Sequence, residues 1–192
     1  MATALLASYE KDAALLRLGR LLSEEGWTLL GSPGTAQYLN ENGIKCRDVA
    51  SIVGPPILGH RVVTLSRELS AGLLATDADN GELSRLQIPR IDLVYVTLYP
   101  FEQTIADPAS TPEDILEKTD IGGPTLLRAA AKGRRLVLSN ASQIDELEAW
   151  MNGGEDVSER FKLTLKFAAA AERRVADYAA ASAAYWEKQV QK

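Results

Sequence analysis

The chain has 192 residues, of which 46% are apolar and 24% are charged, and its net charge is −5. This length and composition fit one soluble globular domain with a sizeable core, with or without an extension. The acidic balance argues against non-specific nucleic-acid binding, although a helix N-terminus can still bind phosphate locally. The single cysteine, Cys46, excludes disulfides and cysteine-based zinc sites within the chain.

Targeting and membrane features are also absent from the sequence. No stretch approaches the roughly 18 consecutive apolar residues of a membrane span. The N-terminus lacks the basic start and long apolar core of a signal peptide. We therefore expect a cytoplasmic protein that binds neither membranes nor nucleic acids.

The first half of the chain alternates short apolar runs with segments whose apolar residues recur at helical spacing. Gly26 and Gly43 are suited to end two of these helices, and Gly31–Thr35 is typical of a tight turn. In chain order we predict a strand over 2–7, a helix over 11–25, a strand over 27–30, a helix over 35–42, a weaker strand over 44–49 and a short helix over 69–75.

The second half contains the clearest strand, Ile91–Leu98, whose nearly continuous apolar residues indicate that both of its faces are covered. Thr111 and Pro112 mark the start of a helix, as N-cap and first helical residue. We further predict a helix over 125–131, a strand over 135–138, a helix over 143–151, and one or two helices in the alanine-rich tail over 158–189, packed on the domain or on a partner chain.

Strands that alternate with helices imply an α/β fold with a doubly wound, mainly parallel sheet flanked by helices. We predict such a domain over residues 1–154 and a C-terminal helical extension over 155–192. Open α/β sheets bind their ligands at the carboxyl ends of the strands. The segment after the strand at 91–98 is therefore the first place to look for a site.

That segment brings together a tyrosine, a carboxylate, a glycine pair and a lysine. Tyr99 suits acid–base or orienting work, or is a packed aromatic residue at a strand end. Asp120 precedes the glycines and a helix, so it is a functional carboxylate, an N-cap, or both. Gly122 and Gly123 bring backbone N–H groups near a ligand oxygen or simply form a turn. Lys132 binds an anion or interacts with the dipole of the helix it ends.

The turn between the second predicted strand and the next helix suits a phosphate group. Its hydroxyl and N–H groups face the start of a helix, although Pro33 removes one donor. The residues that we predict for this phosphate site are Ser32, Gly34, Thr35, Lys11 and Arg61.

The other charged residues do not indicate a site. His60 is the single histidine, so a multi-histidine metal site is excluded, and we predict a surface or packing role for it. The Arg134-Arg135 pair is interpreted as solvated surface charge.

Three motifs, in this order, resemble a known family: Leu98-Tyr99-Pro100-Phe101, Asp120-Ile121-Gly122-Gly123-Pro124 and Leu127-Arg128-Ala129-Ala130-Ala131-Lys132. They resemble the IMP cyclohydrolase domain of the bifunctional purine biosynthesis protein, which has the methylglyoxal-synthase-like fold. The resemblance extends from Ala4 to about Tyr178 and does not include the formyltransferase domain of that protein. Together the motifs are specific, whereas Leu-Tyr-Pro-Phe alone is weak.

The resemblance implies a ring closure in which a carboxamide nitrogen attacks a neighbouring formyl carbon and water leaves. It implies a phosphoribosylated heterocyclic substrate, a homodimer, and no metal or redox cofactor. The catalytic residues that it implies are Tyr99, Asp120 and Lys132. The substrate and phosphate contacts that it implies are Lys11, Ser32, Gly34, Thr35, Arg61, Thr64, Thr97, Gly122 and Gly123.

The sequence departs from the family pattern at positions expected to face the ligand. The family's Arg-Val-Lys-Thr-Leu-His-Pro is Arg-Val-Val-Thr-Leu-Ser-Arg at residues 61–67, so Val63 stands where the family has a catalytic lysine. A second family histidine falls at Ser70, and Thr97 replaces an asparagine. The family's Ser-Val-Ser-Asp-Lys is Ala-Ser-Tyr-Glu-Lys at residues 7–11. Because the framework is retained, these changes indicate a changed substrate, a changed mechanism or lost catalysis.

Two classes of function follow. The first is a cyclohydrolase-type enzyme acting on a formamido-imidazole-carboxamide ribotide or a related heterocycle, in purine synthesis or in a specialised pathway. The second is a non-catalytic nucleotide-sensing or partner-binding module on the same fold, for which Val63 is the best argument. A methylglyoxal synthase is disfavoured, because that reaction needs a catalytic aspartate and histidine and His60 is the single histidine.

Overall fold

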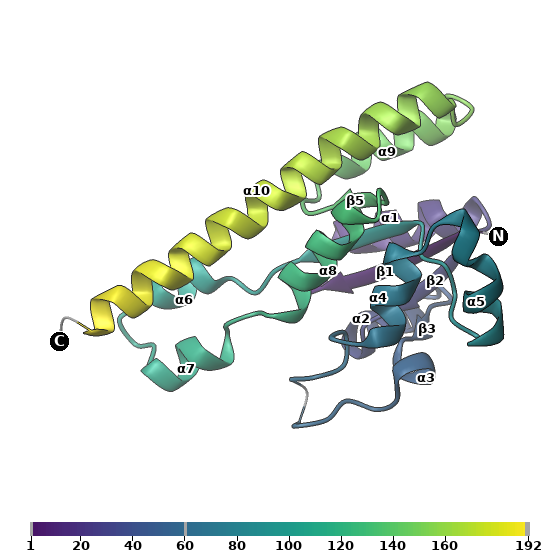
Figure 1. Cartoon of the computed structure of the whole chain (residues 1–192). Coiled ribbons are helices and arrows are strands. Elements are labelled where there is room, and N and C mark those ends of the chain that lie inside the picture. Colours follow the sequence, from purple (N-terminus) through teal and green to yellow (C-terminus); the bar gives the residue numbers. More distant parts are fainter. Residues whose placement is uncertain (1, 60, 191–192) are drawn as a thin grey trace.

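A five-stranded sheet forms the centre of the computed structural model, which describes residues 2–59 and 61–190 (Figure 1). Its strands are β1 (Thr3–Ser8), β2 (Thr28–Gly31), β3 (Arg47–Asp48), β4 (Leu93–Thr97) and β5 (Leu136–Leu138). They lie in the order β3-β2-β1-β4-β5, and each neighbouring pair is parallel. The predicted doubly wound sheet is therefore confirmed.

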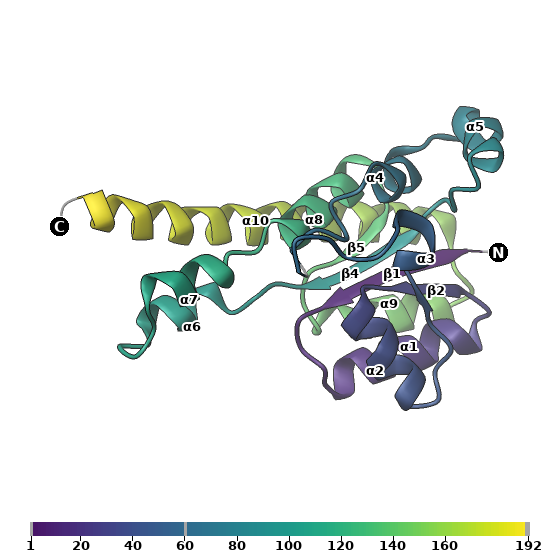
Figure 2. The ribbon, with the colours of Figure 1, turned by 90° about the horizontal axis from the view of Figure 1, so that it is seen from below.

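Helices cover both faces of this sheet. They are α1 (Ala13–Glu24), α2 (Pro33–Glu41), α3 (Ala50–Val53), α4 (Arg67–Leu74), α5 (Asn80–Arg85), α6 (Phe101–Ala106), α7 (Pro112–Glu117), α8 (Gly122–Lys132), α9 (Gln143–Asn152) and α10 (Val157–Val190). Figure 2 shows α1, α2 and α9 on one face, and α4, α8 and α10 on the other. Between the layers lies one large apolar core that includes residues from every strand but β3.

Strands β1 and β4 form the middle of the sheet and pair over five residues, from Ala4 opposite Leu93 to Ser8 opposite Thr97. Their interior side chains are buried except that of Ala7, which is partly buried, as expected for strands covered on both faces. The two strands end side by side, so the residues that follow each of them start from neighbouring positions.

The predicted elements are found within a few residues of their expected bounds, with three corrections. The turn predicted at Gly31–Thr35 is the start of α2, because proline is preorganised for the first helical position and Pro33 occupies it. The weak third strand pairs only at Arg47–Asp48. The helix predicted from Thr125 begins three residues earlier, at Gly122. Helices α3, α5 and α6 were not predicted.

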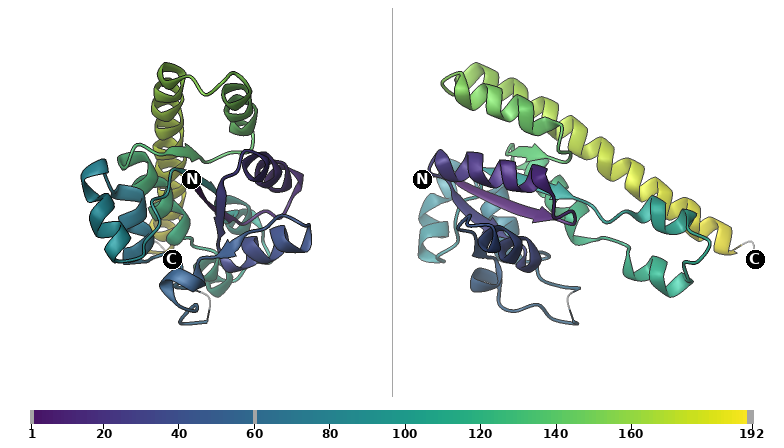
Figure 3. Two further views of the ribbon diagram at one scale, coloured as in Figure 1. Left: turned by 90° about the vertical axis from the view of Figure 1, so that its right-hand side faces the viewer. Right: turned by 180° about the vertical axis from the view of Figure 1, so that it is seen from behind.

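The alanine-rich tail is a single 34-residue helix, α10, that packs on α8, β5, α6 and α9. It buries Phe167, Ala171, Tyr178 and Tyr185. Its C-terminal half extends beyond the carboxyl ends of the strands, where α6 lies alongside it (Figures 1 and 3). Among the helices described, none is both long and apolar enough to cross a membrane. The division of the chain at residue 154 stays a prediction.

The segment between α8 and β5, residues 133–135, contacts the C-terminal end of α4. The Arg135 guanidinium is buried, against our prediction of surface charge. Its Nε donates to the Leu73 carbonyl oxygen at 2.7 Å, and its Nη2 donates to the Ala75 carbonyl. A cation that binds carbonyls at a helix C-terminus satisfies acceptors that the helix itself leaves unpaired. Gly133 approaches so closely that an added Cβ would lie 2.0 Å from the Leu73 oxygen.

This contact predicts that Gly133→Ala destabilises the protein by about 1–3 kcal/mol or more, because backbone must shift to admit the methyl group. The matched control is Gly81→Ala in α5, where an added Cβ meets nothing within 4 Å. The control should be neutral or stabilising by about 0.4–1 kcal/mol. Urea denaturation followed by circular dichroism measures both. Equal stability of the two variants would contradict the close contact.

Candidate functional site

A cavity of about 570 Å³ opens at the carboxyl edge of the sheet, where β1 and β4 end. From β1 the chain proceeds to β2 on one side, whereas β4 is followed by β5 on the other side. Such a divergence leaves a crevice outside the strand ends, which is where open α/β sheets bind ligands. The cavity is lined by residues from the ends of β1, β2 and β4, by residues 58 and 61–65, and by residues between 116 and 126.

Tyr99 follows β4 and lines this cavity. Its carbonyl oxygen accepts a hydrogen bond from the Phe101 amide at 2.8 Å, and the Phe101 ring is fully buried against Tyr178 and Tyr185 of α10. Burial raises the pKa of the Tyr99 phenol above its ordinary value, and the negative charge of Asp120 adds to the rise. At neutral pH the phenol is thus a protonated hydrogen-bond donor.

Asp120 lies at the start of α8, with one carboxylate oxygen accepting the Gly123 amide at 2.9 Å. The amides of Tyr99 and Gly122 also stabilise its charged form, yet burial outweighs them and raises the pKa of the carboxyl. The carboxylate therefore both caps the helix and remains a stronger base than an exposed aspartate. An added Cβ at Gly123 would lie 2.5 Å from its other oxygen, so glycine is required there.

The start of α8 also touches the segment that carries Val63 and Thr64. An added Cβ at Gly122 would lie 2.6 Å from Thr64 Oγ1. Both Val63 and Thr64 line the cavity, and Val63 packs against the apolar core. The position of the family lysine is thus an aliphatic part of the cavity wall.

Four hydroxyl groups connect the ends of β1, β2 and β4. Ser32 Oγ donates to Thr35 Oγ1 at 2.9 Å, and Thr35 Oγ1 lies 3.1 Å from the Ser8 amide, which donates to it. Ser8 Oγ and Thr97 Oγ1 share a hydrogen bond of 2.7 Å. This network places Ser32, Thr35 and Thr97 at one edge, beside the N-terminus of the nine-residue helix α2. The first amides of that helix precede its internal hydrogen bonds and suit an anion.

The two predicted cations differ in position. The Lys11 ammonium donates to the carbonyls of Ser8 and Tyr9, and its Cε lies 3.8 Å from where a Cβ on Gly34 would be. Burial lowers its pKa, and it stands beside the turn at α2. Arg61 lines the cavity but is exposed, with Nη2 3.3 Å from Glu117 Oε2.

The structure does not bring Lys132 to this site. Lys132 is exposed and ends α8, whereas Gly122 begins it, and ten residues of helix separate them by about 15 Å. Within one chain, Lys132 therefore lies apart from Tyr99 and Asp120, and its assignment as a catalytic residue stays a prediction. Its position agrees with the alternative, a cation at a helix C-terminus. His60 lies outside the described residues.

One residue of α10 that the sequence did not reveal also supports the site. Tyr178 of α10 accepts a hydrogen bond from the Asp120 amide at 2.7 Å and donates to the Lys118 carbonyl at 3.2 Å. Its hydroxyl thus fixes the turn between α7 and α8 that carries Asp120. Burial raises the pKa of Tyr178 to about 12, so the group stays protonated. Because these partners are about sixty residues apart, no local pattern could have revealed them.

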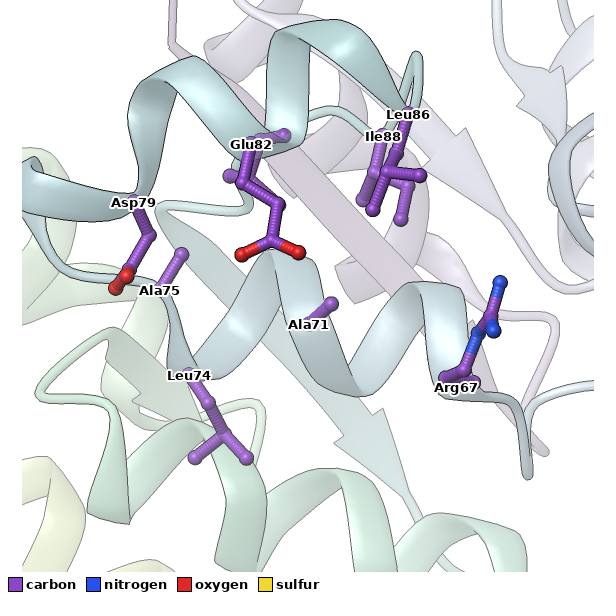
Figure 4. Close-up of a pocket in the computed structure, with 9 residues that line it drawn as sticks. Arg67, Ala71, Leu74, Ala75, Asp79, Glu82, Leu86 and Ile88 are labelled. Atoms are coloured by element: carbon purple, nitrogen blue, oxygen red, sulfur yellow. The ribbon is translucent and has the colours of Figure 1, made fainter.

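A second hollow of about 370 Å³ lies between α4 and α5 (Figure 4). Its lining is mainly aliphatic, and the Glu82 carboxylate projects into it from α5. It lacks the convergent polar groups found at the carboxyl edge, so we place the site at the larger cavity. Within the part of the chain that the structure describes, no cluster of histidine, cysteine, aspartate or glutamate could hold a metal ion.

Residues 14–125 match the model of the MGS-like domain, over more than half of the chain, and the chain belongs to this family. The bifunctional purine biosynthesis protein PurH of Natranaerobius thermophilus is 43% identical over 129 residues, which cover 67% of this chain and 25% of PurH. PurH of Prochlorococcus marinus is 36% identical over 194 residues, which cover 98% of this chain and 37% of PurH. The predicted resemblance is thus confirmed, and the chain spans only about a quarter to just over a third of these relatives.

A solved structure is similar over nearly the full length of both chains. The crystal structure of ForH aligns with a TM-score of 0.80 and 32% sequence identity, and the alignment covers 95% of this chain and 97% of ForH. The fold described above, with its C-terminal helix, is therefore similar to that of a protein of matching length.

The hydrogen bonds of Tyr178 give a first test of the site. Tyr178→Phe should lower the free energy of unfolding by about 1–3 kcal/mol, because the partly buried Asp120 amide loses its acceptor. The matched control is Tyr185→Phe, which keeps the ring that packs on Phe101 and should cost less. Thermal denaturation of both variants measures the difference. Equal losses would mean that the Tyr178 hydroxyl does not support the turn.

The raised pKa of Asp120 gives a second test. Because burial favours its neutral form in the folded protein, the stabilisation that protonated Asp120 provides is lost as pH rises through its folded pKa. Asp120→Asn does not titrate, so its free energy of unfolding relative to the wild type should increase between about pH 4 and about pH 7. Urea denaturation at both pH values checks the sign. A relative decrease would indicate a lowered pKa instead.

Proposed function

We propose that the protein is a cyclohydrolase-type enzyme that closes, or hydrolyses, the ring of a formamido-imidazole-carboxamide ribotide or a related phosphoribosylated heterocycle. The observation that supports this most is the cavity at the ends of β1 and β4, which combines Tyr99, the start of α8 and the hydroxyl-lined turn at α2. Its volume suits a ligand of nucleotide size. The similarity to PurH supports the same reaction class.

The residues divide the work as follows. The α2 N-terminus, Ser32 and Lys11 bind the phosphate group. The substrate itself holds the carboxamide nitrogen beside the formyl carbon, so proximity needs no protein group. Asp120 accepts the proton that the carboxamide nitrogen loses as the new C–N bond forms. Tyr99 donates a hydrogen bond to the formyl oxygen as the C–N bond forms. That oxygen then leaves as water with two protons: the carboxamide proton, which Asp120 returns, and the proton of the formamido nitrogen, which is lost as that nitrogen forms a double bond to the former formyl carbon.

A second function is favoured by Val63. An aliphatic side chain in the cavity wall neither transfers protons nor polarises a carbonyl, and its position is that of the family lysine. A protein that binds the ribotide without converting it would act as a nucleotide sensor.

We also propose that the protein is a homodimer. The exposed Phe161 and Leu165 side chains of α10 provide apolar surface for the contact between the two copies. Sedimentation velocity measures the oligomeric state and tests this proposal.

One assay separates the two functions. Purified protein is incubated with the formamido-imidazole-carboxamide ribotide, and ring closure is followed by ultraviolet absorbance. We expect acceleration over the uncatalysed reaction. Tyr99→Phe should lower kcat by about 10²–10³-fold, as for loss of a hydrogen-bond donor to the developing oxyanion, and Asp120→Asn should lower it by about 10²–10⁴-fold, as for loss of a proton-transfer group. The matched control is Lys132→Met, which should stay within about twofold because it lies about 15 Å along α8 from the site.

The outcomes of this assay are distinct. No acceleration together with measurable ribotide binding would identify the sensing module. A loss of activity in Lys132→Met as large as that in Asp120→Asn would restore Lys132 to the site, contributed by a second copy of the chain.

A further inference from the structure

Tyr9 and Tyr99 form a pair of aromatic rings at the site. Tyr9 follows β1 and Tyr99 follows β4, and their ring centroids lie 4.7 Å apart with an angle of 48° between the planes. Both residues line the cavity. The Tyr9 amide donates to the Thr97 carbonyl at 3.2 Å. This hydrogen bond extends the β1–β4 pairing by one residue and holds the Tyr9 backbone in place.

The Lys118 ammonium lies over both rings, 5.7 Å from the Tyr9 centroid and 5.6 Å from the Tyr99 centroid. Lys118 lines a different hollow, beside α6 and α7, so this cation is not part of the cavity wall. A cation at this distance from a ring face is attracted by the ring quadrupole. Lys118 in turn is held through its carbonyl by Tyr178. The aromatic pair is thus fixed by contacts from outside the cavity.

The Tyr9 ring still has surface to offer to a ligand. Tyr9 is 39% exposed, whereas Phe101, two residues after Tyr99, is fully buried. An aromatic side chain that is fixed in place and partly exposed at a cavity provides a flat surface on which a planar ring stacks at little cost in conformational entropy. Nearby, Val63 and Leu126 line the same cavity with aliphatic surface, which also suits an uncharged ring rather than a charged group.

We propose that Tyr9 is a specificity-determining residue that stacks on the planar heteroaromatic ring of the ligand, and that Lys118 is a positioning residue for the Tyr9–Tyr99 pair. The inference rests on the proposed function in that it uses the same cavity. It goes further by assigning the recognition of the ring to a residue at which the chain departs from the family pattern, as the sequence at 7–11 shows. Recognition of the phosphate belongs to the separate turn at α2.

The test compares two ligands that share a phosphate and differ in the ring. The dissociation constants of inosine 5′-monophosphate and of ribose 5-phosphate are measured by titration calorimetry for the wild type, Tyr9→Ser, Tyr9→Phe and Lys118→Met. Loss of a stacking platform should weaken binding of the nucleotide to Tyr9→Ser by roughly 5- to 150-fold. Tyr9→Phe keeps the ring and should bind within about twofold of the wild type. Ribose 5-phosphate should bind all four proteins alike.

Lys118→Met removes the cation and keeps a long apolar side chain. Loss of one partly exposed cation–π contact should weaken nucleotide binding by roughly two- to fivefold. Circular dichroism of each variant confirms that the fold is retained.

Three results would overturn the proposal. In the first, Tyr9→Ser weakens both ligands equally, which would mean that Tyr9 acts through Lys11 and the phosphate. In the second, Tyr9→Ser leaves the dissociation constants of both ligands unchanged. In the third, the wild type fails to bind the nucleotide. The proposed function can fail separately from this inference. If the protein does not close the ring but binds the nucleotide in a Tyr9-dependent way, the enzymatic function is wrong and the stacking role of Tyr9 stands. If the protein closes the ring and Tyr9→Ser leaves KM unchanged, the enzymatic function stands and the stacking role is wrong.

Discussion

The parallel pairing of β1 with β4 is the contact on which the site depends. These two strands are neighbours in the sheet although almost ninety residues separate them, and their register places Ser8 opposite Thr97. The chain then leaves β1 and β4 for opposite sides of the sheet, so their carboxyl ends cannot be covered by a single connecting helix. Tyr9 directly follows β1, Tyr99 is the second residue after β4, and their rings are in contact at the cavity. A slip in this register would move one ring away from the other.

The C-terminal helix α10 supports the site without entering it. Its ring at Tyr178 packs against Phe101, which immediately follows the Tyr99-Pro100 pair, and its hydroxyl binds the turn that carries Lys118 and Asp120. Both segments that present the candidate catalytic groups are therefore fixed by one buried side chain. Loops at active sites are among the least stable parts of a protein unless such contacts hold them. The alanine-rich tail is thus a structural component of the site rather than an appendage.

The sequence predicted those features that depend on local pattern and missed those that depend on distance. The apolar run of β4 and the Thr111 cap of α7 were identified because each is encoded within a few residues. The start of α8 was placed too late, since Gly122 and Gly123 disfavour a helix until Asp120 caps it. The order of the motifs suggested that Lys132 lies near Asp120, but the length of α8 separates Lys132 from the start of the helix. The role of α10 rests on contacts some sixty residues apart.

The lining of the cavity limits which chemistry it can support. Val63 in the cavity wall provides no charge. The Tyr99 phenol in the wall and the Asp120 carboxyl beside the cavity both have pKa values raised by burial. A reaction that generates a strongly charged intermediate would require a cation that the cavity wall does not supply at residue 63. Ring closure between adjacent groups requires fewer charged protein groups, because the substrate itself holds the two reacting atoms together. The protein has to accept one proton and to stabilise one oxygen. In the proposed reaction, the aliphatic and aromatic surfaces would hold the formamido and carboxamide groups in the plane of the ring, which is the conformation that brings the nitrogen to the formyl carbon.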